Sequence, residues 1–232
     1  MIEMTLDYAA ELLGEYLGAA WTPHRARVML AKYDACLLAM EWETFQIHTR
    51  GSSARRDDVE FYSHSALYLL ELLHWNTSAA FKAYQRELAT VSGLKIIDFG
   101  AGIGTLSHQL ASQDNHVIYC DVNERCFDFA KWWGKKCGTD VTYLLGPGFS
   151  ISEYGPCDLL LAVDVVEHLE VPTEWLRDVA RAVKIGGHLY AKPSWGFQHV
   201  YPMHHDHSAM WLGALEQAGF EPKSSGWIER IR

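Results

Sequence analysis

The segment from Ile96 to Ser107 constrains the fold of this chain more than any other. It reads IIDFGAGIGTLS, which is an apolar run, three alternating glycines and then residues with helical spacing. This order predicts a strand, a tight loop and the N-terminus of a helix. Glycine permits positive φ angles and lets a ligand approach closer than a Cβ would allow. Because backbone N–H groups and the helix dipole favour negative charge, the loop predicts a site for a carboxylate or phosphate.

Length and charge exclude several classes of protein. The chain has 232 residues, which is enough for one full α/β domain with a cap. Its net charge of −9, with no Lys/Arg cluster, argues against a nucleic-acid partner. The five cysteines have no C-x-x-C spacing, and no uncharged apolar run is long enough to cross a membrane. We therefore expect a cytoplasmic protein without a signal peptide or a membrane partner; its oligomeric state stays open.

The N-terminal region is predicted to be wholly helical. Apolar residues recur at helical spacing there, and Gly18 and Pro23 separate the first two segments. Helices are expected over about residues 2–18, 23–47, 58–75 and 77–91. The composition changes near Ser92-Gly93. We therefore divide the chain into a helical cap over residues 1–92 and an α/β domain over residues 93–232.

From Leu94 onward, short apolar runs alternate with helical segments, which is the pattern of βαβ units around a parallel sheet. Strands are expected at residues 95–99, 116–121, 141–145, 159–164 and 188–192. Helices are expected at residues 105–112, 124–137, 173–183 and 208–218, and residues 220–232 would add one or two terminal strands. The predicted fold is α/β, with a doubly wound, mostly parallel sheet and an N-terminal helical cap.

An acidic residue, Asp121, ends the predicted strand that follows the glycine loop. A carboxylate at this place can accept hydrogen bonds from both hydroxyls of a ribose. The loop is not the G-x-G-x-x-G fingerprint of dinucleotide-binding proteins, because the third glycine position falls on Thr105. The two features together indicate a nucleoside cofactor, and a nicotinamide-dependent oxidoreductase remains one alternative.

Two later segments carry further signals. LLLAVDVVEHL, residues 159–169, is an apolar strand that ends at Asp164, and ligands bind at the carboxyl ends of such strands. VKIGGHLYA, residues 183–191, is interpreted as a helix end closed by two glycines and followed by a strand. Together with IIDFGAGIG and VIYCDV, these segments resemble the class I S-adenosylmethionine-dependent methyltransferases in order and spacing. The resemblance extends from Leu94 to about Gly219.

The resemblance implies S-adenosylmethionine as the cofactor. Residues expected to hold its methionine part are Asp98, Gly100, Ala101, Gly102 and Gly104. Asp121 would bind the ribose and Val122 would flank the adenine, while Asp164 and Val165 would line the active-site side. The loop after the third strand, GPGFS, departs from the family's usual pattern, in which an acidic or polar residue contacts the adenine amine. Backbone groups and stacking by Phe149 are therefore expected there.

The resemblance also implies transfer of a methyl group to an oxygen, nitrogen, carbon or sulfur atom of a small-molecule acceptor. The chain lacks the Asn/Asp-Pro-Pro-aromatic tetrad of enzymes that methylate exocyclic amines of nucleic acids, which disfavours a nucleic-acid substrate. The helical cap and the loop after the fifth strand are expected to form the acceptor pocket. Candidate residues are Glu60, Tyr62, His64 and Trp75 in the cap, and Trp195, Phe197 and His199 in the loop.

A hydroxyl or carbon acceptor needs a general base, and histidine is the first candidate because its pKa lies near the working pH. The candidates are His168, beyond the fourth strand, and His204, His205 and His207, after the fifth. The same histidines suggest a metal-assisted enzyme, but adjacent residues point in different directions. We predict no metal, and keep the metal-assisted enzyme and a non-catalytic cofactor-binding member as alternatives.

Overall fold

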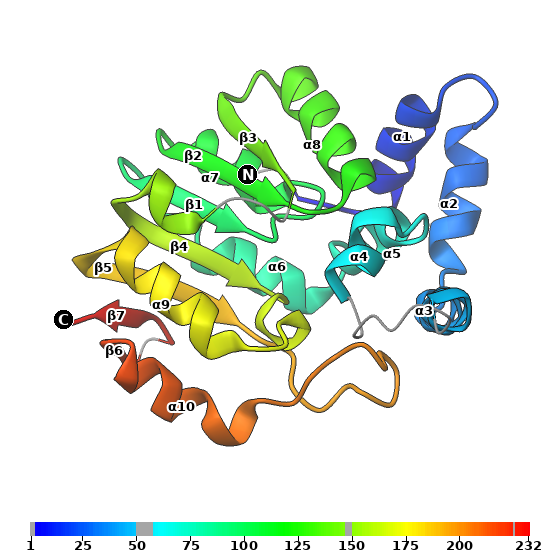
Figure 1. Ribbon diagram of the computed structural model, residues 1–232. Coiled ribbons are helices and arrows are strands. Elements are labelled where there is room, and N and C mark those ends of the chain that lie inside the picture. Colours follow the sequence, from blue (N-terminus) through cyan, green and yellow to red (C-terminus); the bar gives the residue numbers. More distant parts are fainter. Residues whose placement is uncertain (1–2, 50–57, 147–149, 225) are drawn as a thin grey trace.

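The computed structural model describes residues 3–49, 58–146, 150–224 and 226–232. Seven strands form one sheet in the order β3-β2-β1-β4-β5-β7-β6 (Figure 1). They are β1 (Lys95–Phe99), β2 (His116–Asp121), β3 (Val141–Leu145), β4 (Cys157–Val163), β5 (Val183–Lys192), β6 (Phe220–Pro222) and β7 (Ile228–Arg230). Strands β1 to β5 run parallel, and β7 is antiparallel to both β5 and β6. Since the strand order reverses between β1 and β4, a crevice for a ligand is expected at their carboxyl ends.

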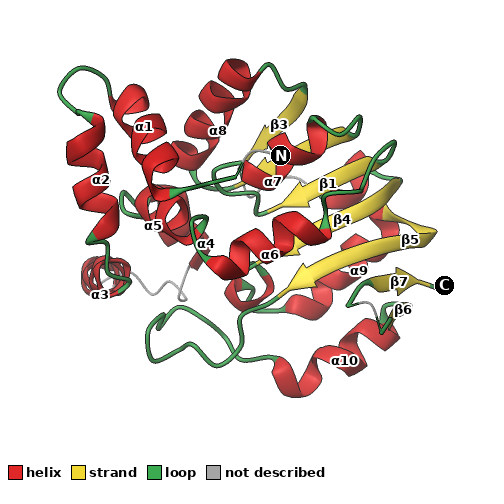
Figure 2. Ribbon diagram, turned by 180° about the vertical axis from the view of Figure 1, so that it is seen from behind, coloured by secondary structure: helices red, strands yellow, loops and turns green. Residues whose placement is uncertain are grey.

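Helices precede the sheet and cover both of its faces. The N-terminal ones are α1 (Leu6–Leu17), α2 (Pro23–Ala31), α3 (Cys36–Thr49), α4 (Asp58–His64), α5 (Tyr68–Trp75) and α6 (Ala79–Glu87). The others are α7 (Thr105–Ala111), α8 (Glu124–Cys137), α9 (Pro172–Ala182) and α10 (Ser208–Gln217), with short 3-10 helices η1 (Ile151–Tyr154) and η2 (Val166–His168). α6 and α7 lie on one face of the sheet, and α9 and α10 lie on the other (Figures 1 and 2).

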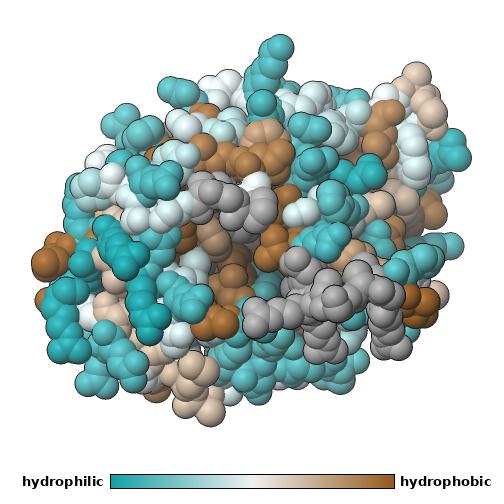
Figure 3. Space-filling view, viewed as in Figure 1, coloured by the Kyte–Doolittle hydropathy of each residue, from teal (hydrophilic) through white to brown (hydrophobic). Residues whose placement is uncertain are grey.

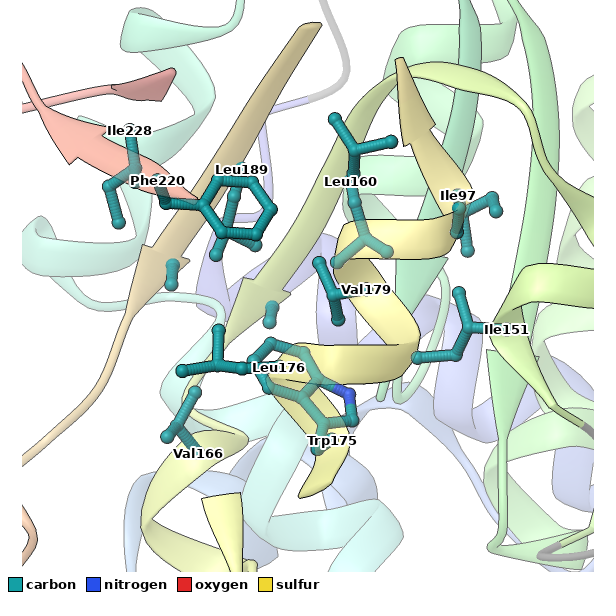
Figure 4. Packing of buried hydrophobic residues seen from close by; sticks show 14 of the residues in the cluster. Ile97, Ile151, Leu160, Val166, Trp175, Leu176, Val179, Leu189, Phe220 and Ile228 are labelled. Atoms are coloured by element: carbon teal, nitrogen blue, oxygen red, sulfur yellow. The ribbon is translucent and has the colours of Figure 1, made fainter. Parts of the chain in front are cut away.

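Each face of the sheet is closed by its own apolar core. On the α9 face, Trp175, Leu176 and Val179 point toward Leu160 and Leu189 of the sheet (Figure 4). On the opposite face, side chains of α6 and α7 pack on alternate strand residues such as Ile96 and Leu161. The pattern of a parallel sheet buried on both sides explains why its strands are near-continuous apolar runs.

The N-terminal helices pack against the domain through two further clusters. α1, α2 and α5 bury their apolar faces against α8, where Trp133 is fully buried. α3 and α4 contribute Trp42 and Phe61 to a cluster that includes Met203, from the loop after β5. The helical region is thereby held over the carboxyl ends of the strands. The division of the chain at residue 92 stays a prediction.

The predicted fold class is confirmed, and the bounds of β1, β2, β3 and α8 match the prediction. The predicted helix over residues 23–47 is instead two helices, because the Asp34 side chain accepts the Cys36 N–H at 2.9 Å and turns the chain. The helix predicted up to Trp75 is also broken, between His64 and Tyr68. At this break Ser65 accepts the Tyr68 N–H at 3.1 Å, and Glu41 of α3 accepts the Ala66 N–H at 2.8 Å.

The segment at Val183 differs from its interpretation as a helix end. Val183 is the first residue of β5 and pairs with Cys157. Gly186 and Gly187 lie inside this strand, where the register shifts between Cys157 and Leu159. A Cβ on Gly187 would come within 2.9 Å of the Asp158 carbonyl oxygen, so this glycine permits a close backbone approach rather than ending a helix.

Candidate active site

The glycine loop between β1 and α7 depends on backbone conformations that favour glycine. The φ angles are 69° at Gly100, 56° at Gly102 and 79° at Gly104. A Cβ at Gly100 would overlap the Cγ2 atom of Val165, and one at Gly102 would lie 2.6 Å from the Cδ1 atom of Leu72. Both positions therefore need glycine for conformation and for space.

The N–H groups of this loop already have acceptors within the protein. Those of Gly100 and Ala101 donate to the carbonyl oxygen of Cys120 at 2.9 and 3.0 Å, and that of Gly104 donates to Ala101 at 2.9 Å. The Gly102 N–H donates to Asp121 Oδ2 at 2.7 Å. These four N–H groups therefore hold the loop in its own shape, and binding of a ligand by the loop N–H groups stays a prediction.

Asp121 is fixed at the end of β2. Besides the Gly102 N–H, its carboxylate accepts the Asn123 N–H at 2.8 Å. Burial raises the pKa of Asp121, and its backbone hydrogen bonds oppose that effect. Asn123 in turn caps α8 and donates its side-chain amide to the carbonyl oxygen of Tyr62 in α4. Asp121, the residue predicted to bind the ribose, thus lies where the sheet meets the helical cap.

Two adjoining cavities open at the carboxyl ends of the strands. The larger has a volume of about 350 Å³ and lies between the glycine loop, α5 and the loop after β5. The smaller, of about 200 Å³, lies at the end of β2 and includes Asp121 and Val122. Residues that line both are Tyr62, Tyr68, Gly100, Asp164 and His168. The surface is hollowed on this face, and apolar residues gather there (Figure 3). Cavities of this size suit a small ligand.

Asp164 stands at the junction of the two cavities. Trp75 Nε1 donates to its Oδ2 at 3.0 Å, and the Ser194 hydroxyl donates to its Oδ1. Its φ angle of 53° is unusual for a residue other than glycine. Burial raises the pKa of Asp164, although these hydrogen bonds lower it. The cap and the loop after β5 therefore both orient this carboxyl group.

Glu167 lies next to Asp164 in the larger cavity and is fully buried. Its Oε1 accepts the Ser194 N–H at 3.0 Å, but its Oε2 has no hydrogen-bond partner among the described residues. Burial, and after it the charge of Asp164, raises the pKa of Glu167 to about 8. The group is therefore a neutral carboxylic acid at pH 7 and presents an O–H or oxygen to the cavity.

We expect the Glu167→Gln variant to differ from the wild-type chain in the pH dependence of stability. The folded chain keeps a proton on Glu167 between the ordinary carboxyl pKa of 4.5 and about 8, whereas the unfolded chain has lost it. Stabilisation from this group is complete below pH 4.5 and is lost as the pH rises through about 8, at up to about 1.4 kcal/mol per pH unit. In urea unfolding, the free energy of unfolding of the glutamine variant should therefore increase relative to that of wild type as the pH rises. A stability difference that stays constant over this pH range would exclude the raised pKa.

Two of the predicted histidines meet in the larger cavity. The His168 and His204 rings lie 4.5 Å apart between centroids, and His168 also contacts Tyr62 at 4.6 Å. Burial lowers the pKa of His168 well below its ordinary value and that of His204 to about 4. Both Nδ1 atoms lack a hydrogen-bond partner among the described residues. Both rings are therefore neutral at pH 7, and each has a nitrogen for a ligand.

The other two predicted histidines lie outside both cavities. The His205 N–H donates to the Glu167 carbonyl oxygen at 2.7 Å, and His207 Nε2 lies 2.9 Å from the Leu169 carbonyl oxygen. Their rings stack on each other with centroids 5.6 Å apart. These contacts hold the end of the loop after β5 against Glu167 and Leu169.

The structure brings some of the predicted acceptor residues together and leaves others apart. Tyr62, Trp75 and Phe197 line the larger cavity. Trp195 packs on Trp211 and His207, and His64, His199 and Glu60 are exposed outside both cavities.

The predicted cofactor residues are divided between the cavities. Asp98, Gly100, Ala101 and Gly102 line the larger one, and Val122 and Val165 line the smaller. Gly104 is the N-cap of α7 and lines neither cavity. Asp98 accepts the Ser107 hydroxyl at 2.6 Å, and burial raises its pKa to about 6. Phe149 lies outside the described residues.

Several cavity residues were not predicted. Thr105 and Asn76 line the larger cavity, and the Thr105 hydroxyl and Asn76 Oδ1 lack partners among the described residues. Glu71 lines it as well, and it is the one acidic side chain of α5, YLLELLHW. That isolated charge in an apolar helix was a signal that sequence reasoning could have used. Tyr68 and Tyr201 carried no such signal.

Neither a metal site nor a membrane span is found in the described part of the chain. Over residues 3–49, 58–146, 150–224 and 226–232, no three His, Cys, Asp or Glu side chains are grouped as a metal site requires. Among the same residues, no helix combines the length and the apolar character needed to cross a membrane. The alternative of a metal-assisted enzyme therefore has no ligand set in this part of the chain.

Comparison with known proteins places residues 97–189 in the family described as methyltransferase domain. The ubiquinone biosynthesis O-methyltransferase of Caulobacter vibrioides is 32% identical over 109 residues, which cover 44% of this chain and 41% of the relative. The protein of the same name from Aliivibrio fischeri is 29% identical over 100 residues, or 42% and 43% of the two chains. This chain thus spans about two fifths of the length of these relatives.

Solved structures show the same fold. Magnesium protoporphyrin IX methyltransferase from Synechocystis PCC 6803, with bound S-adenosylmethionine, superposes with a TM-score of 0.54. The superposition covers 77% of this chain and 97% of that chain, at 16% sequence identity. A sequence identity of this size supports a shared fold only.

Proposed function

Because the chain belongs to the class I S-adenosylmethionine-dependent methyltransferases, as its motifs predict, we propose that it methylates a hydroxyl group of a small organic acceptor. The observation that carries this proposal is the pair His168 and His204. Both imidazoles are neutral, line the larger cavity and have an Nδ1 atom without a hydrogen-bond partner among the described residues. A neutral imidazole can take the proton of a hydroxyl acceptor. Relatives named as O-methyltransferases support the choice of oxygen.

The residues of the two cavities fit S-adenosylmethionine. The Thr105 hydroxyl can donate to the carboxylate of its methionine part, and Asn76 Oδ1 can accept from its ammonium group. Asp121 and Val122 in the smaller cavity suit the ribose and the adenine. No Lys or Arg is among the described residues that line either cavity, which suits a positively charged sulfonium.

When bound, the cofactor supplies a methyl group on a positively charged sulfur. The chain orients the acceptor, excludes water and receives a proton. His168 lines both cavities, so it lies where donor and acceptor meet. We therefore assign proton acceptance to His168, and assign to His204, which contacts it and lines only the larger cavity, the orientation of the acceptor.

We expect S-adenosylhomocysteine, the demethylated cofactor, to stabilise the chain, and NAD to leave it unchanged. At a hundred times its Kd, a ligand that binds only the folded state adds about 2.7 kcal/mol, which shifts Tm by several degrees. Thermal unfolding with each ligand measures this. Stabilisation by NAD and not by S-adenosylhomocysteine would favour the oxidoreductase alternative.

We further expect Thr105→Val to weaken S-adenosylhomocysteine binding by about tenfold. The substitution keeps the size of the side chain but removes a hydroxyl that we assign to the cofactor carboxylate, and a hydrogen bond to a charged group contributes about 1.5 kcal/mol or more. Thr44→Val is the matched control, because Thr44 is exposed on α3 and its hydroxyl donates to the Met40 carbonyl oxygen of the same helix. Equal affinities in calorimetric titration of both variants would exclude this role for Thr105.

A further inference from the structure

Glu71, on the acceptor side of the larger cavity, has no part in the reaction proposed above. Its side chain is only 8% exposed and lines the larger cavity from α5. The Tyr201 hydroxyl donates to Glu71 Oε1 at 2.8 Å, whereas Oε2 has no hydrogen-bond partner among the described residues. A buried carboxylate oxygen without a donor is costly. A ligand that brings an N–H donor would remove this cost.

The surroundings of Glu71 suit a positive charge. The aromatic residues that line the larger cavity are Tyr62, Tyr68, Trp75, Phe81, Phe197 and Tyr201. Ring faces attract an ammonium group, and the attraction grows when water is excluded. Because no Lys or Arg is found among the described lining residues, no protein cation competes for this carboxylate in the cavity.

The hydroxyl groups next to Glu71 carry no charge. Burial, and after it the charge of Glu71, raises the pKa of both Tyr33 and Tyr201, so both phenols stay protonated. A side-chain hydrogen bond to Glu71 is a further cause of the raised pKa of Tyr33, but Tyr33 does not line the larger cavity. A ligand N–H group in this cavity can therefore meet Glu71 and the phenol oxygen of Tyr201 at the same place.

The position of Glu71 separates it from the cofactor residues of the smaller cavity. Glu71 lines only the larger cavity, whereas Asp121 and Val122 line the smaller. Its partner Tyr201 stacks on His204, with ring centroids 4.9 Å apart and an interplanar angle of 13°. A continuous row of contacts thus joins Glu71 to the histidine pair and places the carboxylate on the acceptor side.

We propose that Glu71 and Tyr201 form a binding subsite for a protonated amine, so that the acceptor carries an amino group as well as the hydroxyl that is methylated. The identification of this ligand as the acceptor rests on the proposed function. The amine would donate an N–H to Glu71 Oε2 and lie against the aromatic wall, while the hydroxyl faces His168. Acceptors with a carboxylate at the same place would be repelled.

The test uses the full chain loaded with S-adenosylhomocysteine and three probes of the same shape: 2-phenylethylamine, 2-phenylethanol and phenylacetate. In calorimetric titration, the amine should bind about tenfold or more tightly than the alcohol, and the carboxylate most weakly. Glu71→Gln should abolish the preference for the amine and leave the S-adenosylhomocysteine affinity unchanged. The matched control is Glu170→Gln, which removes an exposed carboxylate outside both cavities and should keep the preference.

Tyr201→Phe gives a second, independent variant in case Glu71→Gln does not fold. It keeps the ring and removes the hydrogen bond that orients the carboxylate, and should reduce the amine preference about threefold. Three outcomes would overturn the subsite: no preference for the amine, a preference that survives Glu71→Gln, or a variant that loses S-adenosylhomocysteine affinity instead. Failure of S-adenosylhomocysteine to bind would contradict the proposed function alone, because the amine preference can then be measured on the free chain.

Discussion

Replacing His168 with glutamine is expected to lower kcat for methyl transfer by about 10²–10⁴, the usual contribution of a general base. Glutamine retains a polar side chain but cannot accept a proton at neutral pH. The residue is partly buried, and its buried Nδ1 atom lacks a hydrogen-bond partner among the described residues. The measurement is the rate of S-adenosylhomocysteine release with a hydroxyl acceptor at saturation.

His204→Gln is the matched comparison for His168→Gln. His204 is also neutral and partly buried but lines only the larger cavity. We expect its loss to raise KM with a smaller change in kcat, because it orients the acceptor. If His168→Gln kept kcat within about threefold of wild type while His204→Gln abolished turnover, the two roles would be reversed.

Replacing Gly100 with alanine is expected to lower the free energy of unfolding by about 2–4 kcal/mol, the sum of left-handed backbone strain and overpacking. Gly100 has a φ of 69°, and its new Cβ would overlap the Val165 side chain. Since Gly100 lines both cavities, the same shift of the loop should weaken cofactor binding more than about tenfold. Urea unfolding and calorimetric titration with S-adenosylhomocysteine measure the two effects.

Gly138→Ala is a matched control for this substitution. Gly138 ends α8 with a φ of 68°, but nothing lies within 4 Å of the position that a new Cβ would take there. It should therefore show only the conformational cost of about 1–2 kcal/mol, with cofactor affinity unchanged. Equal losses of stability in both variants would mean that Val165 moves aside and that the close approach at Gly100 has no energetic weight.

The fold was largely predictable from local pattern. The runs at residues 95–99 and 116–121 are strands with the predicted bounds because a buried parallel strand is a largely apolar run, and the edge strand at 141–145 also has its predicted bounds. The breaks within the cap were not predictable. They depend on contacts such as Glu41 with the Ala66 N–H, which join residues far apart in the sequence. The early start of β5 at Val183 likewise follows from its pairing with Cys157.

The candidate site was predictable where a strand end fixes a residue. Asp164 and His168 lie just after β4, so the end of this strand places them at the crevice independently of how the helical cap packs. The side of α5 that faces the cavity was harder to predict, because Glu71 and Asn76 reach it only once the cap has packed. Among the histidines after β5, the loop path alone decides that His204 faces inward while His205 does not.

A crystal structure of the chain with S-adenosylhomocysteine bound tests the central claim most directly. We expect the ribose hydroxyls at Asp121, the amino-acid end of the ligand at Thr105 and Asn76, and its sulfur facing the space beside His168. A ligand seated elsewhere, or a sulfur turned away from the histidine pair, would contradict both the cofactor site and the assigned acceptor side.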